Sequence, residues 1–141
     1  MKFYFAGSIR GESPDTDWFH LLIKHISKYG KVLTEHSFGF PYDEEIKLDD
    51  FSIYETDIEW LRESDALIAE VTAPSLGVGY EIAKAEEWGK PILLLYKDRP
   101  GRKPSAMLNG NKDLKMVKYS DDQEALRAID IFMKEFQSEF E

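Results

Sequence analysis

Short apolar runs that alternate with segments of helical periodicity restrict the fold of this chain more than any other feature. The apolar runs predict strands at residues 2–6, 31–34, 66–71, 92–96 and 114–119. Apolar residues at helical spacing predict helices over residues 15–29, 50–64, 77–88 and 121–140. Strands that alternate with helices form βα units around a parallel sheet. We therefore predict an α/β fold, doubly wound in the Rossmann or flavodoxin-like manner, with a five-stranded, mainly parallel sheet and helices on both faces.

The chain has 141 residues, the size of one domain, and we expect a single domain over residues 1–141. Residues 37–49 and 97–112 are rich in Gly, Pro and polar side chains, which predicts loops. In doubly wound sheets, ligands bind beyond the carboxyl ends of the strands, near the point where the strand order reverses. Functional residues are therefore expected in the loops after the first, third and fourth strands.

The composition excludes several classes of function. The 18 basic and 27 acidic residues give a formal net charge of −9, whereas a nucleic-acid polymer needs a broad basic surface. The absence of cysteine excludes disulfides, thiolate metal sites and a thiol nucleophile. No run approaches the roughly 20 apolar residues that span a bilayer, and the N-terminal run is too short for a signal peptide. We expect a cytoplasmic protein that contacts neither membrane nor nucleic acid, while a few local donors can still hold a small anion.

A glycine-rich turn, Gly7-Ser8-Ile9-Arg10-Gly11, follows the first predicted strand. Its glycines permit a tight turn, the Ser8 hydroxyl can donate, and the Arg10 guanidinium can bind an oxyanion through two hydrogen bonds. The glycine spacing matches neither the dinucleotide-binding motif nor the Walker motif. The turn is therefore either an anion-binding loop or an ordinary strand exit with a solvated arginine.

A second candidate region joins the third strand to the helix predicted at residues 77–88. Ser75 can cap this helix, and Gly77 permits a ligand to approach the backbone closely. The N–H groups at the start of a helix favour an anion. Glu81 falls in the first turns of the helix, where it either faces the mouth of the sheet or only complements the helix dipole.

Asp57 lies on or beside the apolar side of the helix predicted at residues 50–64, four residues from both Ile53 and Leu61. An unpaired charge there would be costly. Asp57 is therefore either paired at the edge of the apolar side or held in a cleft for acid–base chemistry. With Glu81 it forms a pair of carboxylates that suits glycosidic cleavage, in which one attacks the anomeric carbon and the other protonates the leaving group or positions the sugar.

Several motifs occur in a characteristic order along the chain. They are Asp57 and the segments Tyr4-Phe5-Ala6-Gly7-Ser8-Ile9-Arg10-Gly11, Leu33-Thr34-Glu35-His36, Ala69-Glu70-Val71-Thr72, Pro74-Ser75-Leu76-Gly77-Val78-Gly79-Tyr80-Glu81 and Ser105-Ala106-Met107. In this order they resemble the 2′-deoxynucleoside 5′-phosphate N-hydrolases, a family of the nucleoside 2-deoxyribosyltransferase superfamily. The resemblance spans nearly the whole chain.

The resemblance implies an enzyme of deoxyribonucleotide catabolism that hydrolyses the N-glycosidic bond of 2′-deoxynucleoside 5′-monophosphates. The products would be a free base and 2-deoxyribose 5-phosphate. The family pattern implies that Glu81 is the nucleophile of a covalent glycosyl-enzyme and that Asp57 assists departure of the base. It places Tyr4 near the sugar and the nucleophile, and it implies neither a metal nor an organic cofactor.

The resemblance also implies a homodimer with shared sites. The residue matching Ser105 reaches across the interface into the neighbouring site, and Met107 accompanies it. The full set implied to bind the 5′-phosphate and the sugar is Gly7, Ser8, Ile9, Arg10, Ser75, Gly77, Ser105 and Met107.

Three other functions stay open: a deoxyribosyltransferase that passes the sugar to a second base, a ribonucleotide N-glycosidase, and a nucleotide-sensing module without activity. The phosphate-binding set speaks against the transferase, because transferases of this superfamily use unphosphorylated nucleosides. The two carboxylates speak against the sensor, because sensing needs no nucleophile. Base preference stays open, because the base contacts are expected in residues 37–50, which match the family pattern poorly.

Overall fold

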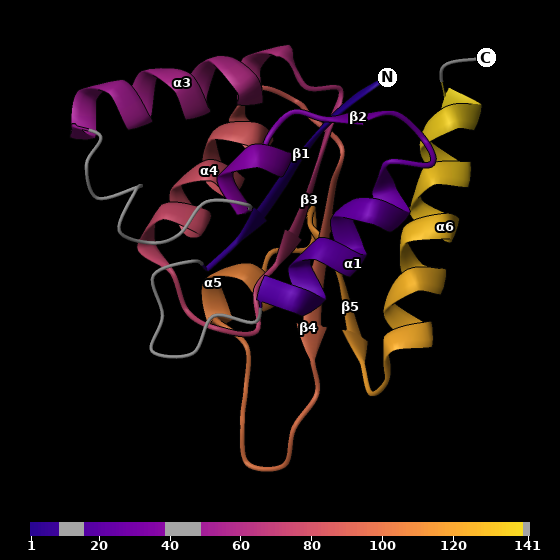
Figure 1. Cartoon of the computed structure of the whole chain (residues 1–141). Helices are drawn as coiled ribbons and strands as arrows, with labels where there is room; N and C mark the ends of the chain where they lie inside the picture. Colours follow the sequence, from indigo (N-terminus) through magenta and orange to yellow (C-terminus); the bar gives the residue numbers. More distant parts are fainter. Residues whose placement is uncertain (9–15, 39–48, 140–141) are drawn as a thin grey trace.

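The computed structural model describes residues 1–8, 16–38 and 49–139. In this part of the chain, five strands form one sheet in the order β2-β1-β3-β4-β5, and every neighbouring pair is parallel. The strands are β1 (Lys2–Gly7), β2 (Lys31–Val32), β3 (Ala66–Glu70), β4 (Ile92–Lys97) and β5 (Lys115–Tyr119), as shown in Figure 1. This is the flavodoxin-like order, so the predicted doubly wound fold is confirmed.

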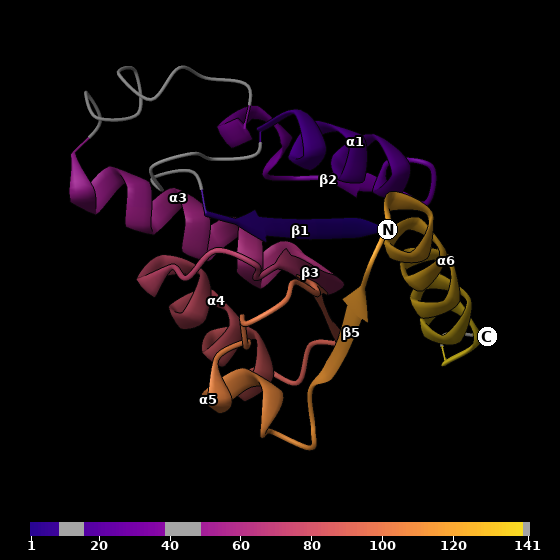
Figure 2. The ribbon, with the colours of Figure 1, turned by 90° about the horizontal axis from the view of Figure 1, so that it is seen from below.

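Helices cover both faces of the sheet, as predicted (Figure 2). One face packs against α1 (Thr16–Ile26) and α6 (Asp122–Glu139). The other face packs against α3 (Asp50–Glu63), α4 (Leu76–Glu87) and the short helix α5 (Ala106–Asn109). No helix among the described residues is both long and apolar enough to cross a membrane.

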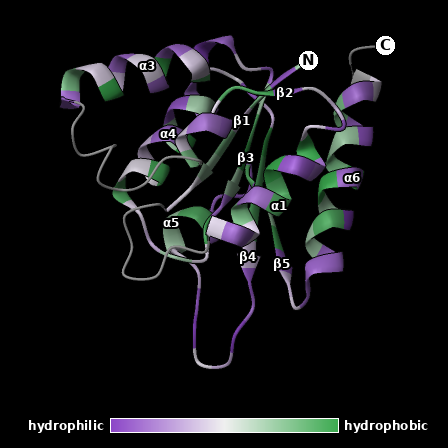
Figure 3. Cartoon of the chain, in the orientation of Figure 1, coloured by the Kyte–Doolittle hydropathy of each residue, from purple (hydrophilic) through white to green (hydrophobic). Residues whose placement is uncertain are grey.

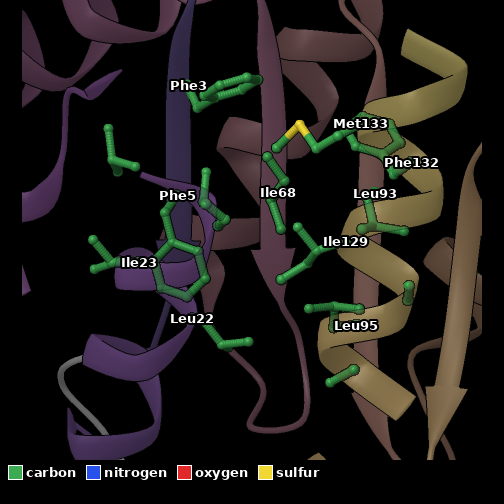
Figure 4. Packing of buried hydrophobic residues seen from close by; sticks show 14 of the residues in the cluster. Phe3, Phe5, Leu22, Ile23, Ile68, Leu93, Leu95, Ile129, Phe132 and Met133 are labelled. Carbon is green, nitrogen blue, oxygen red and sulfur yellow. The ribbon is translucent and has the colours of Figure 1, made fainter. Parts of the chain in front are cut away.

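Strand alternation decides which side chains face which helices, because successive side chains of a strand point to opposite faces. Phe3 and Phe5 of β1 join the cluster beneath α1 and α6, whereas Tyr4 and Ala6 join the cluster beneath α3 and α4. Tyr4 is therefore directed toward the helices that carry the candidate carboxylates. Figure 4 shows the first cluster, with Phe3, Phe5, Ile68, Leu93 and Leu95 from the sheet against Leu22, Ile23, Ile129, Phe132 and Met133 from the helices.

The structure differs from the predicted elements mainly at the edges and in one loop. β2 has two residues rather than four, and α1 ends at Ile26 because turn hydrogen bonds follow, including Tyr29 N–H to the Ile26 carbonyl at 2.9 Å. The loop predicted at residues 97–112 contains the short helix α5. The loop predicted at residues 37–49 begins within a 3-10 helix, η1 (Glu35–Phe38), and its residues 39–48 lie outside the described part. Figure 3 shows the hydrophilic connection between β4 and α5 extending away from the hydrophobic strands.

Candidate functional site

A cavity of about 560 Å³ lies where β1, α3 and the start of α4 come together. It sits beyond the carboxyl end of β1, next to β3. The sheet order reverses between these two strands, which is where doubly wound folds bind ligands. Nine of the residues predicted to act at the site lie in the described part of the chain. Seven of them line this cavity: Tyr4, Gly7, Ser8, Asp57, Ser75, Gly77 and Glu81.

Tyr4, which is buried, and Glu81, which is half-buried, interact directly inside the cavity. Tyr4 is 2% exposed on β1, and its hydroxyl hydrogen-bonds the Glu81 carboxylate from beneath α4. Burial and the nearby carboxylates raise the pKa of Tyr4 far above its ordinary value, so this phenol stays protonated and donates. The Glu81 carboxylate thereby receives a fixed donor inside the cavity.

The acidity of Glu81 is set by opposing influences. Burial and, to a lesser extent, the negative charge of Asp57 raise its pKa, whereas the Tyr4 hydrogen bond lowers it, and the net result is a pKa raised from 4.5 to about 8. Burial disfavours the charged form of a carboxylate, and a like charge does the same. Glu81 and Asp57 therefore retain a proton between them at neutral pH.

Asp57 is half-buried on α3 and lines the cavity that also contains Glu81. Of the two positions open from the sequence, the structure places Asp57 in the cleft. It acts electrostatically on both Glu81 and Tyr4. Two carboxylates and a phenol donor in one cavity provide groups for nucleophilic attack and for proton transfer.

The other end of the cavity is built from serine hydroxyls and backbone N–H groups. Ser75 is the N-cap of α4, and its Oγ accepts a hydrogen bond from the Val78 N–H at 3.2 Å, which leaves the hydroxyl proton free to be donated. The first N–H groups of the helix have no intrahelical partner. Ser8 is buried beside them on the strand exit. This end of the cavity suits an anion.

Gly7 occupies a position at which a side chain would not fit. A Cβ added there would lie 2.9 Å from the Phe19 ring of α1, closer than such atoms approach. The glycine therefore lets the Phe19 ring of α1 pack closely against the end of β1. Ile9 and Arg10, predicted to bind phosphate from this turn, lie outside the described residues.

Ser105 and Met107 do not line the cavity that holds Glu81. They line a second cavity of about 690 Å³ between α4 and α5. Ser75 and Leu76 line both cavities, so the two are neighbours. The Met107 side chain is 83% exposed and that of Leu76 97% exposed. Within one chain, the structure thus brings the carboxylates and the first serines together and leaves Ser105 and Met107 outside.

Sequence reasoning missed an aromatic pair at the cavity. Tyr54 of α3 and Tyr80 of α4 both line it, with ring centroids 6.3 Å apart in an edge-to-face arrangement and a hydrogen bond between the two side chains. Tyr80 directly precedes Glu81, and Tyr54 is three residues before Asp57. The closeness of both tyrosines to the candidate carboxylates in the sequence could have indicated that they belong to the site. Their contact with each other could not be predicted, because it depends on how α3 packs on α4.

Thr34 is a second residue that sequence reasoning did not single out. It is 3% exposed and lines the cavity after β2. Its Oγ1 accepts from the Phe5 N–H at 3.0 Å and donates to the Phe5 carbonyl at 2.8 Å, which extends the β2–β1 pairing by side-chain bonds. Among the described residues, no group of three or more His, Cys, Asp or Glu side chains could hold a metal ion.

Comparison with known proteins adds a family match over most of the chain. The model of the family described as nucleoside 2-deoxyribosyltransferase matches residues 3–116. A Nematostella vectensis protein named "Putative 2′-deoxynucleoside 5′-phosphate N-hydrolase 1" is 48% identical over 112 residues, which cover 77% of this chain and 76% of that protein. A Mus musculus 5-hydroxymethyl-dUMP N-hydrolase is 47% identical over 113 residues, which cover 78% of this chain and 65% of that protein.

A solved structure resembles the fold over nearly its whole length. The Clostridium botulinum CMP N-glycosidase superposes with a TM-score of 0.67, covering 94% of this chain and 99% of the other. The two sequences are 19% identical. This likeness supports the α/β architecture described above.

Proposed function

Because the chain belongs to the nucleoside 2-deoxyribosyltransferase family, we propose that it hydrolyses the N-glycosidic bond of 2′-deoxynucleoside 5′-monophosphates, giving a free base and 2-deoxyribose 5-phosphate. The observation that carries the proposal is the cavity that holds Glu81, Asp57 and Tyr4 at one end and an anion-binding helix start at the other. The names of the two relatives given above support the same reaction class.

Glu81 supplies the nucleophile in this proposal. Its carboxylate oxygen forms a bond with C1′ while the bond from C1′ to the base nitrogen breaks, and the base leaves with the electron pair. In the reactive form Glu81 is ionised and accepts the Tyr4 hydrogen bond, while Asp57 carries the proton that the pair retains. Asp57 then gives that proton to the departing base. In the second step Asp57 takes a proton from water, whose oxygen displaces Glu81 from C1′.

The 5′-phosphate binds at the start of α4 in this proposal. The hydroxyl groups of Ser8 and Ser75 donate hydrogen bonds to the phosphate, and the N–H groups of Gly7 and Gly77 add backbone donors. Arg10, with the neighbouring Ile9, is proposed to complete this set, as the sequence motif predicts. Binding energy from the phosphate orients C1′ over Glu81, so contacts remote from the reacting bond contribute to the rate.

We further propose that the active form is a homodimer in which Ser105 and Met107 enter the partner's site. The placement of both residues at a second cavity next to the first, with Met107 and Leu76 strongly exposed, supports a contact between two copies at this face. The cytoplasmic location expected from the sequence remains a prediction.

A substrate panel tests the proposed reaction. The purified protein is incubated with dGMP, 5-hydroxymethyl-dUMP, GMP and deoxyguanosine, each with and without an acceptor base, and free base is measured by chromatography. The proposal predicts base release from the deoxynucleotides that depends on the 5′-phosphate. Equal turnover of deoxyguanosine would contradict the phosphate role.

The same panel separates the alternatives. A new nucleoside that forms only with the acceptor base would indicate a transferase, and preferential release from GMP would indicate a ribonucleotide N-glycosidase. Binding without turnover of any compound would indicate a nucleotide sensor. Comparison of dGMP with 5-hydroxymethyl-dUMP gives the base preference. The second compound is included because the mouse relative is named a 5-hydroxymethyl-dUMP N-hydrolase.

A further inference from the structure

Glu70 is a buried carboxylate that the proposed reaction does not use. It is the last residue of β3 and is 3% exposed. It pairs in register with Gly7 of β1 and Leu95 of β4, at the carboxyl ends of the central strands. It lines neither cavity. A charge buried at this place is costly unless hydrogen bonds compensate it.

Both oxygens of the Glu70 carboxylate accept hydrogen bonds. Oε1 accepts from the Thr72 N–H at 2.7 Å, and Oε2 accepts from Thr72 Oγ1 at 2.8 Å and from the Tyr119 hydroxyl of β5. Burial and the Glu70 charge raise the pKa of Tyr119, so its hydroxyl remains a donor. The Glu70 carboxylate therefore connects Thr72, two residues further along the chain, to Tyr119 of β5, which lies two strands away from β3 in the sheet.

The network extends beyond Glu70 at both ends. Trp18 Nε1 of α1 donates to the Tyr119 hydroxyl at 2.8 Å. The Lys97 N–H at the end of β4 donates to Thr72 Oγ1 at 2.8 Å, so this hydroxyl accepts one bond and donates another. Thr72 is thus hydrogen-bonded both to Glu70 of β3 and to Lys97 of β4. A hydrogen-bonded network of this kind fixes one arrangement more sharply than apolar packing does.

Thr72 begins the connection that leads to the anion-binding helix start. Three residues further on, Ser75 caps α4 and lines the cavity. An apolar side chain of similar volume would fill the space of a buried carboxylate without its desolvation cost. The Glu70 carboxylate differs from an apolar side chain because its two oxygens bind the Thr72 N–H and hydroxyl. These hydrogen bonds fix the direction in which the chain continues from Thr72 to Ser75.

We propose that Glu70 is a positioning residue, which acts through Thr72 to fix the connection that presents Ser75 and the start of α4 to the 5′-phosphate. This inference rests on the proposed function for the identity of the ligand. It predicts that loss of the network weakens the phosphate contacts and leaves the Glu81 and Asp57 chemistry largely intact.

Three variants interrupt the network at different points: Glu70→Gln, Thr72→Val and Tyr119→Phe. For each, we would measure KM and kcat for dGMP, the Kd for inorganic phosphate by calorimetry, and the thermal unfolding temperature. We expect KM and the phosphate Kd to rise together by about tenfold in Glu70→Gln and Thr72→Val, since misplacement remote from the chemistry has effects of at least this size, while kcat changes less than about threefold. Thr72→Ser, which keeps the hydroxyl, should restore the wild-type constants.

Tyr29→Phe is the matched control. Tyr29 also donates to a carboxylate, Asp130 at 2.6 Å, but this pair joins the turn after α1 to α6 and lines neither cavity. Tyr29→Phe should leave KM and the phosphate Kd unchanged. Equal changes in Tyr29→Phe and Tyr119→Phe would show a general loss of stability and would overturn the proposal.

The phosphate measurement separates this inference from the proposed reaction. Unchanged phosphate Kd and KM in Thr72→Val would overturn the positioning role even if Glu70→Gln fails to fold. A wild-type protein that binds phosphate but releases no base would contradict the proposed reaction, while the variants would still decide the role of Glu70. A wild-type protein that does not bind phosphate would overturn the inference.

Discussion

At the scale of single residues, Glu81 is poised between two neighbours with opposite effects. Tyr4 donates a hydrogen bond that favours the carboxylate, and Asp57 brings a like charge that favours the protonated acid. The position of Glu81 next to the helix start was predictable from its motif. Its contact with Tyr4 was not, because it depends on β1 lying under α4 and on which face of β1 Tyr4 occupies.

The carboxylate pair predicts a specific pH profile. The reaction needs one proton on the pair, and Glu81 loses its proton with a pKa of about 8 when Asp57 is charged, so kcat/KM should fall as the pH rises through about 8. Tyr4→Phe removes the donor that lowers the pKa of Glu81 and should move this alkaline limb to higher pH. Steady-state values of kcat/KM measured across the pH range give the pH at which this alkaline fall occurs.

Asp57→Asn provides the opposite comparison. It removes the like charge that raises the pKa of Glu81 and also removes the proton donor, so kcat should fall by about 10²–10⁴-fold and the alkaline limb should disappear. An alkaline limb that keeps its place in both Tyr4→Phe and Asp57→Asn would show that another group titrates there.

At the scale of secondary-structure elements, the start of α4 combines two roles. Ser75 caps the helix and faces the cavity, so one side chain serves both the helix and the proposed phosphate site. The helix and its cap were predictable from apolar spacing and from a serine at the right position. The short helix α5 was not, because four residues in a segment rich in Gly and Pro carry no period, and Leu108 is held by packing against the core.

The two capped helices allow these roles to be separated. Ser75→Ala should lower the free energy of unfolding by about 1 kcal/mol, the usual cost of a lost N-cap, and should also raise KM for the nucleotide. Asp121→Ala is the control, because Asp121 caps α6 by accepting from the Glu124 N–H at 2.9 Å and lines neither cavity. It should cost a similar free energy with no change in KM. Chemical denaturation and steady-state kinetics give the two readouts.

A rise in KM of the same size in Asp121→Ala would show that the effect of Ser75→Ala is loss of helix stability rather than loss of a phosphate donor.

At the scale of the whole molecule, the parallel order of the strands brings the site together. The sequence predicted the strands, and the parallel βα pattern placed their carboxyl ends at one edge, which is why the distant motifs carrying Tyr4, Asp57 and Glu81 could be expected to meet. The Glu70–Tyr119 bond was not predictable, because 49 residues separate the two and only the observed strand order joins them. The single domain over residues 1–141 stays a prediction.

The proposed dimer predicts complementation between two inactive variants. In a mixture of Glu81→Ala and Ser105→Ala, a mixed dimer contains one site with Glu81 of one subunit and Ser105 of the other. Equal mixing should therefore restore about a quarter of the wild-type sites, since half of the dimers are mixed and each has one complete site. The measurement is the rate of base release before and after mixing, with the mass of the assembly followed by light scattering.

No gain in rate after subunit exchange, or a monomer at working concentration, would contradict a site shared between subunits.

Glu81 is proposed to attack C1′ of the deoxynucleotide sugar and to form a covalent intermediate. Mass spectrometry of protein quenched in acid during turnover of dGMP tests it most directly, because the intermediate is covalent. We expect a deoxyribosyl phosphate adduct on the peptide that contains Glu81, and neither adduct nor base release with Glu81→Gln. Base release by Glu81→Gln at the wild-type rate, or an adduct located on another residue, would contradict it.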